Sequence, residues 1–422
     1  MAVLGCIADD FTGASDAASF LVKGGMSVRL YNGIPNHADS LSSDCNNSQE
    51  QAIVIALKSR SEERKRAVKD SLNAADFLLD RGVKQIYFKY CSTFDSTPQG
   101  NIGPVADALM ELTKSHYTLL CPSLPVNGRT VSNGQLMVNG VPLDESPMRN
   151  HPLNPMWDCR ISKLMEPQSH YPAFTISQAQ LTAFSEADFP TTPFYLIPDY
   201  RTDTDGERIA SLFGRLPLLT GGSGLLEHLA RSWEHHLPMS GQIPKSPTKG
   251  YALLLAGSCS KATLAQIARY QSDGHPCYKL NPKDMLDGRQ TLDDAWKFIE
   301  SHTAAGESVL VYSSDTPEKV KEFQALGKEA VAECLEHATA WLAKKAVESG
   351  YTRIITAGGE TSGAVTKKLG FSSYWIGESV APGVPIMVPS GRPDIRLILK
   401  SGNFGQEDFF NHAISITDGG RK

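Results

Sequence analysis

The sequence predicts an α/β protein of two domains, each a mainly parallel sheet flanked by helices, with the active site in the cleft between them. Short apolar runs alternate with segments of helical periodicity, a pattern typical of parallel strands joined by helices. The length of 422 residues is enough for two domains. Residues 238–249 hold three prolines and no apolar periodicity. We therefore expect domains at 1–238 and 250–422, joined by a linker at 239–249.

In the first half, each apolar run is short enough for a buried strand, and a helical pattern follows most of them. From residue 127 to 156 the alternation stops, and this stretch is rich in glycine, proline and asparagine. A stretch of this length is expected to be a functional loop or a disordered one. We expect strands at 3–8, 28–31, 52–57, 85–88, 117–121, 194–198 and 217–220, and helices at 13–22, 62–81, 104–112 and 225–235.

The second half repeats the alternation after the linker. Its apolar runs are again strand-sized, and three of them end in glycine-rich turns. We expect strands at 251–256, 308–312, 353–356 and 396–399, helices at 262–270 and 318–349, and a further helix after residue 363.

Three carboxylates and a hydroxyl crowd the first strand-to-helix turn. Asp9 and Asp10 follow the strand directly, and Thr12 and Asp16 come next. Ligands of open α/β sheets bind at the carboxyl ends of the strands, so this turn is a candidate site. In the structural alternative, Thr12 caps the helix, Asp16 offsets its dipole and the other two acids are solvated. Capping needs one such side chain rather than four, which favours the functional interpretation.

The composition indicates a globular protein and excludes several classes of partner. The chain is 41% apolar and 21% charged, which suits a sizeable core. A formal net charge of -5 gives no electrostatic footprint for nucleic acid or an acidic membrane surface. There is no basic leader, and no apolar run approaches the roughly 20 residues of a membrane span. The eight cysteines are scattered without the close pairs of a zinc site, which indicates reduced thiols in the cytoplasm.

Three glycine turns of the second half share one design. Gly257, Gly358 and Gly402 each follow a predicted strand and stand among small residues. Glycine lets backbone amides approach an anion closely, and a helix amino terminus adds partial positive charge. Together the three turns predict a site for nucleotide phosphates. The motifs of an ordinary P-loop, a dinucleotide fold and a common protein kinase are absent from the sequence.

An acidic site in one half and an anion-binding site in the other suit phosphoryl transfer. This chemistry depends on positioning, charge neutralisation, magnesium and a carboxylate near the acceptor hydroxyl. Two lobes would also allow closure that excludes water from the transferred group.

Several motifs, taken in order, resemble the four-carbon acid sugar kinase family, and the resemblance covers nearly the whole chain. Each motif is short, but their order and spacing across both halves are specific. The motifs are Ile7-Ala8-Asp9-Asp10-Phe11-Thr12-Gly13-Ala14-Ser15-Asp16, Asp95-Ser96-Thr97 with Gly100-Asn101, Gly221-Gly222-Ser223-Gly224, Gly257-Ser258, Gly358-Gly359-Glu360-Thr361 and Lys400-Ser401-Gly402-Asn403-Phe404-Gly405.

The resemblance implies an acid-sugar-binding domain followed by a nucleotide-binding domain, with ATP, as its magnesium complex, phosphorylating a four-carbon sugar acid. The stretch 89–97 and the loop 151–156 look like the branch that phosphorylates 3-oxo-tetronate on its C4 hydroxyl. The threonate and erythronate branch has leucine and a basic residue where this chain has Phe11 and Gln99. A D-threonate or D-erythronate 4-kinase stays as the alternative.

The family's site residues transfer to this chain by position. The catalytic carboxylates would be Asp10 or Asp9, and we favour Asp10. From the family, the substrate would be bound by Asp9, Asp10, Thr12 and Asp16. We add further polar residues as our own inference and not from the family: Arg60, Lys89, Asp95, Asn101 and Arg129, of which the cations suit a substrate carboxylate, and His151 in the proline-rich loop. ATP would be bound by Ser258, Gly358, Gly359, Glu360, Thr361, Ser362, Gly402, Asn403 and Gly405. The metal ligands, and any homo-oligomer, stay open.

A bilobed sensor that closes on a sugar acid without turning it over is the alternative from another class. It would need the crevice but not paired acids facing a nucleotide lobe. Release of ADP from ATP and magnesium on addition of a four-carbon acid separates the two.

Overall fold

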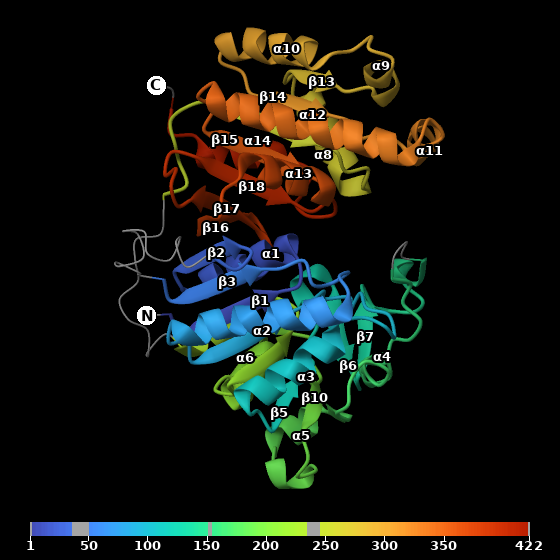
Figure 1. Ribbon diagram of the computed structural model, residues 1–422, viewed down its shortest axis with the longest axis vertical. Coiled ribbons are helices and arrows are strands. Elements are labelled where there is room, and N and C mark those ends of the chain that lie inside the picture. Colours follow the sequence, from blue (N-terminus) through green and yellow to red (C-terminus); the bar gives the residue numbers. More distant parts are fainter. Residues whose placement is uncertain (1, 36–49, 151–153, 234–244, 421–422) are drawn as a thin grey trace. The chain divides into compact units, whose positions relative to one another are not determined.

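The computed structural model describes residues 2–35, 50–150, 154–233 and 245–420. Two compact units divide the chain, Met1–Gln242 and Ile243–Lys422. Each contains mainly parallel strands with helices packed against them, which confirms the predicted fold class (Figure 1). No helix of the described ranges is long and apolar enough to cross a membrane.

The central sheet of the first unit contains five parallel strands in the order β11-β4-β1-β3-β2. Each of the three strands β1, β3 and β4 is buried along its length, which explains their continuous apolar runs. The strands are β1 (Leu4–Ala8), β2 (Val28–Asn32), β3 (Ala52–Ala56), β4 (Gln85–Lys89) and β11 (Leu218–Gly221), and the larger helices are α1 (Phe11–Lys23), α2 (Arg64–Asp80), α3 (Ile102–Thr113), α6 (Asp203–Phe213) and α7 (Leu226–Trp233).

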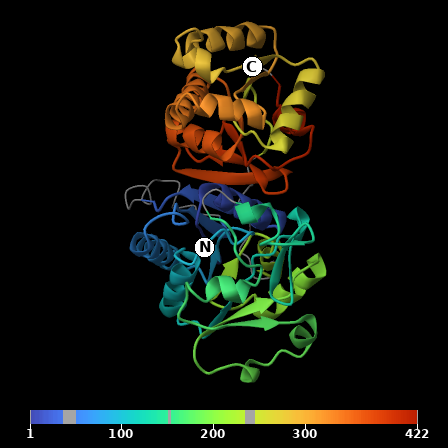
Figure 2. The same cartoon turned by 90° about the vertical axis from the view of Figure 1, so that its right-hand side faces the viewer.

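The strand predicted at 117–121 belongs to a second, three-stranded parallel sheet rather than to the central one. Figure 2 shows green strands of this sheet near the bottom of the first unit. The sheet consists of β5 (Tyr117–Leu119), β9 (Ala173–Ile176) and β10 (Phe194–Pro198), and the short helices nearby are α4 (Ile161–Met165), α5 (Gln178–Thr182) and the 3-10 turn η4 (Glu186–Asp188). It adjoins the central sheet, because Cys121 N–H, just past β5, donates to the Thr220 carbonyl in the strand at 218–221 at 3.1 Å.

The stretch 127–156, expected to be a loop, holds regular structure. Three short antiparallel strands form a small sheet here, with positive φ at the turn residues Asn133 and Asn139. Each strand is short, so its two-residue period was hidden among the turn residues. The elements are η2 (Pro125–Asn127), β6 (Arg129–Ser132), β7 (Gln135–Val138), β8 (Val141–Pro142) and η3 (Pro147–Asn150).

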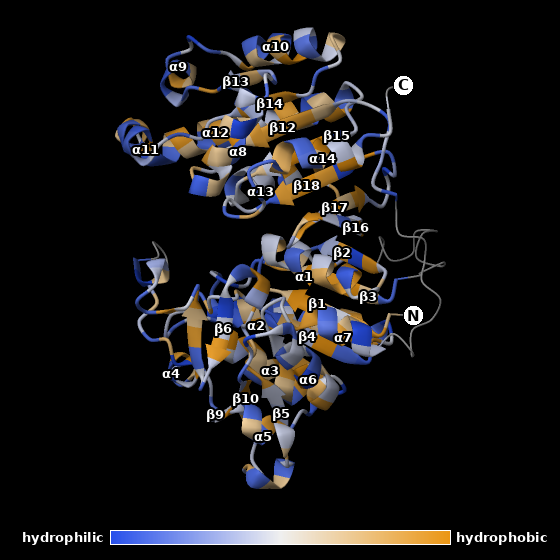
Figure 3. Cartoon of the chain, turned by 180° about the vertical axis from the view of Figure 1, so that it is seen from behind, coloured by the Kyte–Doolittle hydropathy of each residue, from blue (hydrophilic) through white to orange (hydrophobic). Residues whose placement is uncertain are grey.

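The second unit contains seven strands in the order β16-β17-β18-β15-β12-β14-β13, and their pairs are parallel except for those made by β17. Figure 3 shows its central strands as largely hydrophobic, as in the first unit. The strands are β12 (Ala252–Ala256), β13 (Cys277–Lys279), β14 (Val309–Tyr312), β15 (Arg353–Ala357), β16 (Ser373–Ala381), β17 (Val384–Pro389) and β18 (Arg396–Lys400).

The single long helix predicted at 318–349 is wrong. Two helices occupy this stretch, and Gly327 between them has a φ of 122°, a conformation that ends the first helix. The helices of this unit are α8 (Lys261–Ser272), α9 (Pro282–Leu286), α10 (Leu292–Ala304), α11 (Pro317–Gln324), α12 (Lys328–Glu348), α13 (Gly359–Leu369) and α14 (Phe409–Thr417).

Candidate active site

Arg60 lies among three carboxylates, those of Asp9, Asp10 and Asp95, at the carboxyl end of the central sheet in the first unit. Its Nε donates to Asp9 Oδ2 and its Nη2 to Asp9 Oδ1, both at 2.8 Å. Its Nη1 lies 2.8 Å from Asp10 Oδ2 and 3.8 Å from Asp95 Oδ2. Burial alone would lower the pKa of Arg60, but the charges of Asp9 and Asp10 raise it well above its usual value. The guanidinium is therefore a permanent cation between three acids.

Asp10 also fixes the start of α1. It is the N-cap residue, and its Oδ1 accepts a hydrogen bond from the backbone N–H of Gly13 at 2.6 Å. The capping alternative is therefore wrong in its details, because Asp10 and not Thr12 caps the helix, and Asp9 is buried rather than solvated. Thr12 lies half-buried in the first turn of α1.

Neighbouring acids on a strand would point to opposite faces. Here Asp9 and Asp10 both follow the last residue of β1, and both contact the same guanidinium. Their exposure separates them, since the Asp9 side chain is 5% exposed and the Asp10 side chain 32%.

Lys89 and Asp16 form a second ion pair in the same unit. Lys89, the last residue of β4, places its Nζ 4.0 Å from Asp16 Oδ2 on α1, and both side chains are buried. Burial lowers the pKa of Lys89, but the charges of Asp16, Asp10 and Asp9 outweigh this and raise it. Ser223 donates its hydroxyl to Asp16 Oδ2, while Asp16 Oδ1 is buried without a hydrogen-bond partner in the described chain.

Asp95 adopts a conformation that costs backbone energy. Its φ is 27° and that of Phe94 is 61°, in the region that favours glycine. Asn154 Nδ2 donates to Asp95 Oδ1 at 3.0 Å, so a residue from the proline-rich stretch reaches this loop. Asn154 was not predicted, and only its place in that unusual stretch could have suggested it. His151 lies outside the described residues.

Asn101 holds the loop that carries Arg60. Its Nδ2 donates to the backbone carbonyls of Ser59 at 2.7 Å and Glu62 at 2.9 Å. The side chain is 7% exposed in total, so the structure places it beneath the site, where it can position Arg60.

The glycines at 221–224 are required by packing. A Cβ on Gly221, Gly222 or Gly224 would lie 2.2, 2.5 or 2.3 Å from a backbone carbonyl oxygen of the strand-end segment 121–123. This run therefore brings Ser223 to Asp16 by close backbone approach.

In the second unit, the three glycine turns lie against one another. The backbone N–H groups of Gly257 and Ser258 donate to the Ala357 carbonyl at 3.0 and 3.1 Å. Gly358 N–H donates to the Lys400 carbonyl at 2.8 Å. Gly358 has a φ of 134°, and a Cβ there would lie 3.0 Å from the Ser258 nitrogen.

The amino terminus of α13 offers backbone donors. Ser362 N–H bonds to Gly358, but the N–H groups of Gly359, Glu360 and Thr361 donate to no other residue described in this unit. A Cβ on Gly359 would meet nothing within 4 Å. Ser362 and Thr361 are buried, and the Ser362 hydroxyl pairs with Thr356 at 2.7 Å. The backbone at residues 359–361 is thus the part of this turn that can bind an anion.

Lys400 lies beside the glycine turn at 402, although it was not among the predicted site residues. It is fully buried, and burial lowers its pKa to about 8. Its Nζ donates to the Gly402 carbonyl at 3.0 Å, as do the hydroxyls of Ser260 at 2.6 Å and Thr263 at 2.9 Å. In a trans peptide the C=O and the following N–H point in opposite directions. The N–H of exposed Asn403 is therefore directed away from Lys400 and toward solvent.

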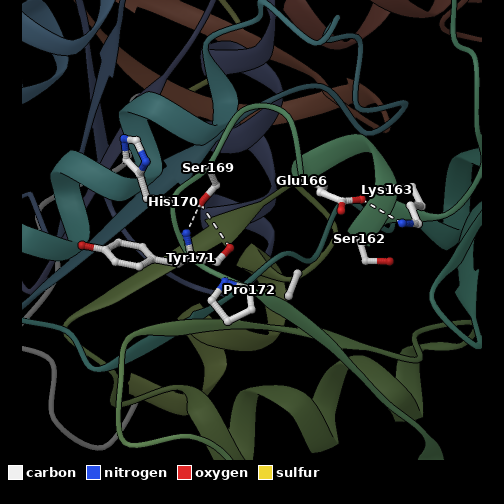
Figure 4. Close-up of a pocket in the computed structure, with 8 residues that line it drawn as sticks. Ser162, Lys163, Glu166, Ser169, His170, Tyr171 and Pro172 are labelled. Carbon is white, nitrogen blue, oxygen red and sulfur yellow. Dashed lines mark hydrogen bonds and ion pairs between the residues drawn. The ribbon is translucent and has the colours of Figure 1, made fainter.

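A cavity of about 490 Å³ lies elsewhere in the first unit, between α4 and β9 (Figure 4). Its lining includes Lys163 paired with Glu166 at 2.8 Å, and the hydroxyl of Ser169, which accepts from Tyr171 N–H. None of the predicted site residues lines this cavity.

Among the described residues, Asp144, Asp158 and Cys159 are the one group with metal-ligand atoms within 4.8 Å of one another. Asp158 is already paired with Arg160 at 2.6 Å. No predicted site residue belongs to this group, so it assigns no metal to the carboxylate site.

The chain matches two domain families in order. Residues 4–229 match the family described as sugar-binding N-terminal domain, and residues 253–410 match the nucleotide-binding C-terminal domain.

Curated relatives match along nearly the full length. A protein of Brucella melitensis named 3-oxo-tetronate kinase is 41% identical, over 98% of this chain and 96% of its own. One of Actinobacillus succinogenes with the same name is 40% identical, over 97% and 99%.

Solved structures agree with this likeness. A Haemophilus influenzae protein has a TM-score of 0.82 and 39% identity, covering 97% of this chain and 99% of its own. A Salmonella typhimurium protein described as a tRNA synthase has a TM-score of 0.85 and 37% identity, covering 98% and 99%.

Proposed function

This chain belongs to the four-carbon acid sugar kinase family, and we propose that it uses ATP to phosphorylate 3-oxo-tetronate on the C4 hydroxyl, giving 3-oxo-tetronate 4-phosphate and ADP. The full-length likeness to relatives that bear the kinase name is the observation that carries this proposal. The buried carboxylate site of the first unit and the exposed backbone amides of the second suit the two substrates.

Asp10 is the general base of the proposed reaction. Both oxygens of Asp9 are bound by Arg60, and this side chain is 5% exposed. Asp10 is 32% exposed and is held in place by Gly13 and Arg60. It can therefore meet an incoming hydroxyl, orient it and accept its proton.

ATP would be bound by the backbone amides of residues 359–361 together with Ser258 and the turn Gly402–Gly405. These groups fit phosphate oxygens, because the amides have no hydrogen-bond partner among the described residues of this unit and a Cβ at Gly359 would meet nothing within 4 Å. Magnesium would enter with ATP and neutralise phosphate charge.

The acid sugar would be bound by the first unit, within the predicted domain 1–238, and ATP by the second, within 250–422. These bounds, the linker 239–249 and an active site between the domains stay predictions.

A primary hydroxyl is the least hindered acceptor on a four-carbon acid. Polar groups of the loop 92–97 would read the 3-oxo group, since a site that pairs a polar substrate group rejects a mismatch by up to about 10⁴- to 10⁵-fold.

The deciding experiment compares kcat/KM for 3-oxo-tetronate, D-threonate and D-erythronate with ATP and magnesium, and locates the product phosphate by NMR. We expect 3-oxo-tetronate to be preferred and C4 to carry the phosphate. If threonate or erythronate is preferred, the kinase assignment holds and the substrate is wrong. If ATP binds but no acid stimulates ADP release, the protein is a sensor instead. The formal net charge of -5 gives no electrostatic footprint for a nucleic acid such as tRNA.

A further inference from the structure

Three cations surround the carboxylates of the first unit, and they differ in how far their charge is already neutralised. Arg60 uses Nε, Nη1 and Nη2 on Asp9 and Asp10. A guanidinium engaged on both edges by the protein's own acids has no edge left for a substrate carboxylate. Arg60 therefore organises the site rather than binding the anion.

Lys89 is also already paired with a carboxylate of the protein. Its Nζ faces Asp16, and a Cβ added to Gly13 would lie 2.7 Å from that nitrogen, which shows how closely α1 covers it. The raised pKa of Lys89 follows from three carboxylates that outweigh its burial.

Of the three cations, Arg129 differs in having no carboxylate partner among the described residues. It opens β6, where its backbone N–H and C=O bond to Leu124 at 3.1 and 2.9 Å. Its Nη1 donates to the carbonyl of Asn127, and its Nε is buried without a hydrogen-bond partner in the part of the chain that the structure describes. No carboxylate lies within ion-pair distance of it among those residues.

The unpaired Nε of Arg129 lies on one edge of its guanidinium, and this edge can still bind a ligand. Burial lowers the pKa of Arg129, and the negative charge of Asp16 opposes this shift. The backbone of Arg129 pairs with Leu124, and a Cβ on Gly224 would lie 3.0 Å from the Cα of Leu124. The residue before Gly224 is Ser223, which donates to Asp16, so Arg129 lies close to the carboxylate site. A buried donor left unpaired costs free energy, and a bidentate carboxylate is the ligand that matches a guanidinium edge.

We propose that Arg129 binds the C1 carboxylate of the sugar acid through its Nε and Nη2 edge, while Arg60 and Lys89 hold the protein's own carboxylates. This inference rests on the proposed function, because it assumes that the first unit binds a sugar acid. In this arrangement the first residue of β6 binds the substrate carboxylate. Asp10 then contacts the C4 hydroxyl at the other end of the substrate.

The test uses a pair of substrates that differ only at C1. Erythrulose keeps the keto and hydroxyl groups of 3-oxo-tetronate but has a primary alcohol where the acid has its carboxylate. In the wild type we expect the acid to be preferred. In Arg129→Met, kcat/KM for the acid should fall about 10- to 10²-fold, as expected for hydrogen bonds between charged groups, while the value for erythrulose should change little.

The matched control is Arg149→Met, which removes an exposed arginine from the same stretch and should leave both substrates unaffected. An equal loss for acid and alcohol in Arg129→Met would overturn the proposal, because it would mean that Arg129 only holds the Asn127 turn. A wild type indifferent to the C1 group would overturn it too.

A second variant and a second pair of substrates cover the cases in which the first comparison cannot be made. If Arg129→Met does not fold, Arg129→Lys retains the charge but not the bidentate edge, and a selective loss for the acid is again expected. If the wild type prefers threonate, the same comparison is run with threonate and its C1 alcohol, threitol. A wrong substrate assignment and a wrong role for Arg129 are thereby distinguished.

Discussion

Arg60 and Asp9 form a two-point ion pair, with Nε to Oδ2 and Nη2 to Oδ1 both at 2.8 Å. Asp9 follows β1 and Arg60 lies beyond β3, and these strands are parallel neighbours in the sheet. The pair therefore ties together two adjacent strand ends, and the third contact, to Asp10, places the proposed base relative to both.

Replacing Arg60 should reduce both stability and turnover. Breaking a buried ion pair by removing one partner costs about 3–5 kcal/mol, and Arg60 is partly exposed, so we expect about 3 kcal/mol for Arg60→Met. Urea unfolding measures this loss. Arg60→Lys, which cannot form the two-point contact, should fold better and still turn over slowly. The control, Lys65→Met, removes an exposed cation and should match the wild type. A fully active Arg60→Lys would refute the organising role.

Asp10→Asn should lower kcat by about 10²- to 10⁴-fold, the usual cost of losing a general base. Asparagine is also a good N-cap, so the helix start and ATP binding should be preserved. Stopped-flow kinetics under saturating ATP would measure the loss. Near-normal turnover in a folded Asp10→Asn protein would remove Asp10 from the role, and a larger loss in Asp9→Asn would assign it to Asp9.

Gly359→Val should weaken ATP binding and leave acid-sugar binding unchanged. A Cβ at Gly359 meets nothing within 4 Å, so the protein tolerates it, but the added methyl groups would stand over the amides offered to phosphate. Gly363 lies one turn further along α13 and its Cβ position is equally open, so Gly363→Val is the matched control. Calorimetric titration with each ligand measures both affinities. Equal loss of the two ligands in Gly359→Val would point to misfolding or another site map.

Lys400 predicts a pH dependence of stability. Burial lowers its folded pKa to about 8 from the ordinary 10.5. Between these values the unfolded chain binds more protons than the folded one, so this group makes the folded state more stable as pH rises from 8 to 10.5. The wild type should therefore gain stability over Lys400→Met across this range, measured by urea unfolding at several pH values. A constant difference between the two proteins would show that Lys400 does not titrate there.

The opening turn was predictable because it depends on a short local pattern. The family and the kinase function were predictable because the order and spacing of several motifs across both halves resemble one family. An apolar run that ends in two acids marks a strand end, and the comparisons confirm the family, the fold class and the kinase activity. Arg60 likewise follows a predicted apolar strand, and in the structure it lies just beyond the carboxyl end of β3.

Contacts across long sequence separations were not predictable. Asn154 reaches Asp95 over 59 residues, and Lys400 reaches Thr263 over 137. Neither residue type signals such a partner, because an isolated asparagine or lysine is usually a surface residue.

Two errors in the elements have local causes. A glycine inside a helical pattern costs only about 1 kcal/mol, so periodicity gave no warning that Gly327 separates two helices. The strand β17 begins and ends near prolines, at Pro385 and Pro389, and proline weakens the signal of a strand.

The hydroxyl that Ser223 gives to Asp16 comes from 207 residues further along the chain, whereas the Arg60 pair closes over 51. Long-range contacts of this kind form only after the chain between them has folded back. During synthesis, the Arg60 pair can form once α3 has emerged and Asn101 holds its loop. Asp16 must wait until β11 and the glycines after it are complete. A nascent chain released before residue 223 would therefore contain Arg60 and its carboxylates but lack the hydroxyl that bonds to Asp16.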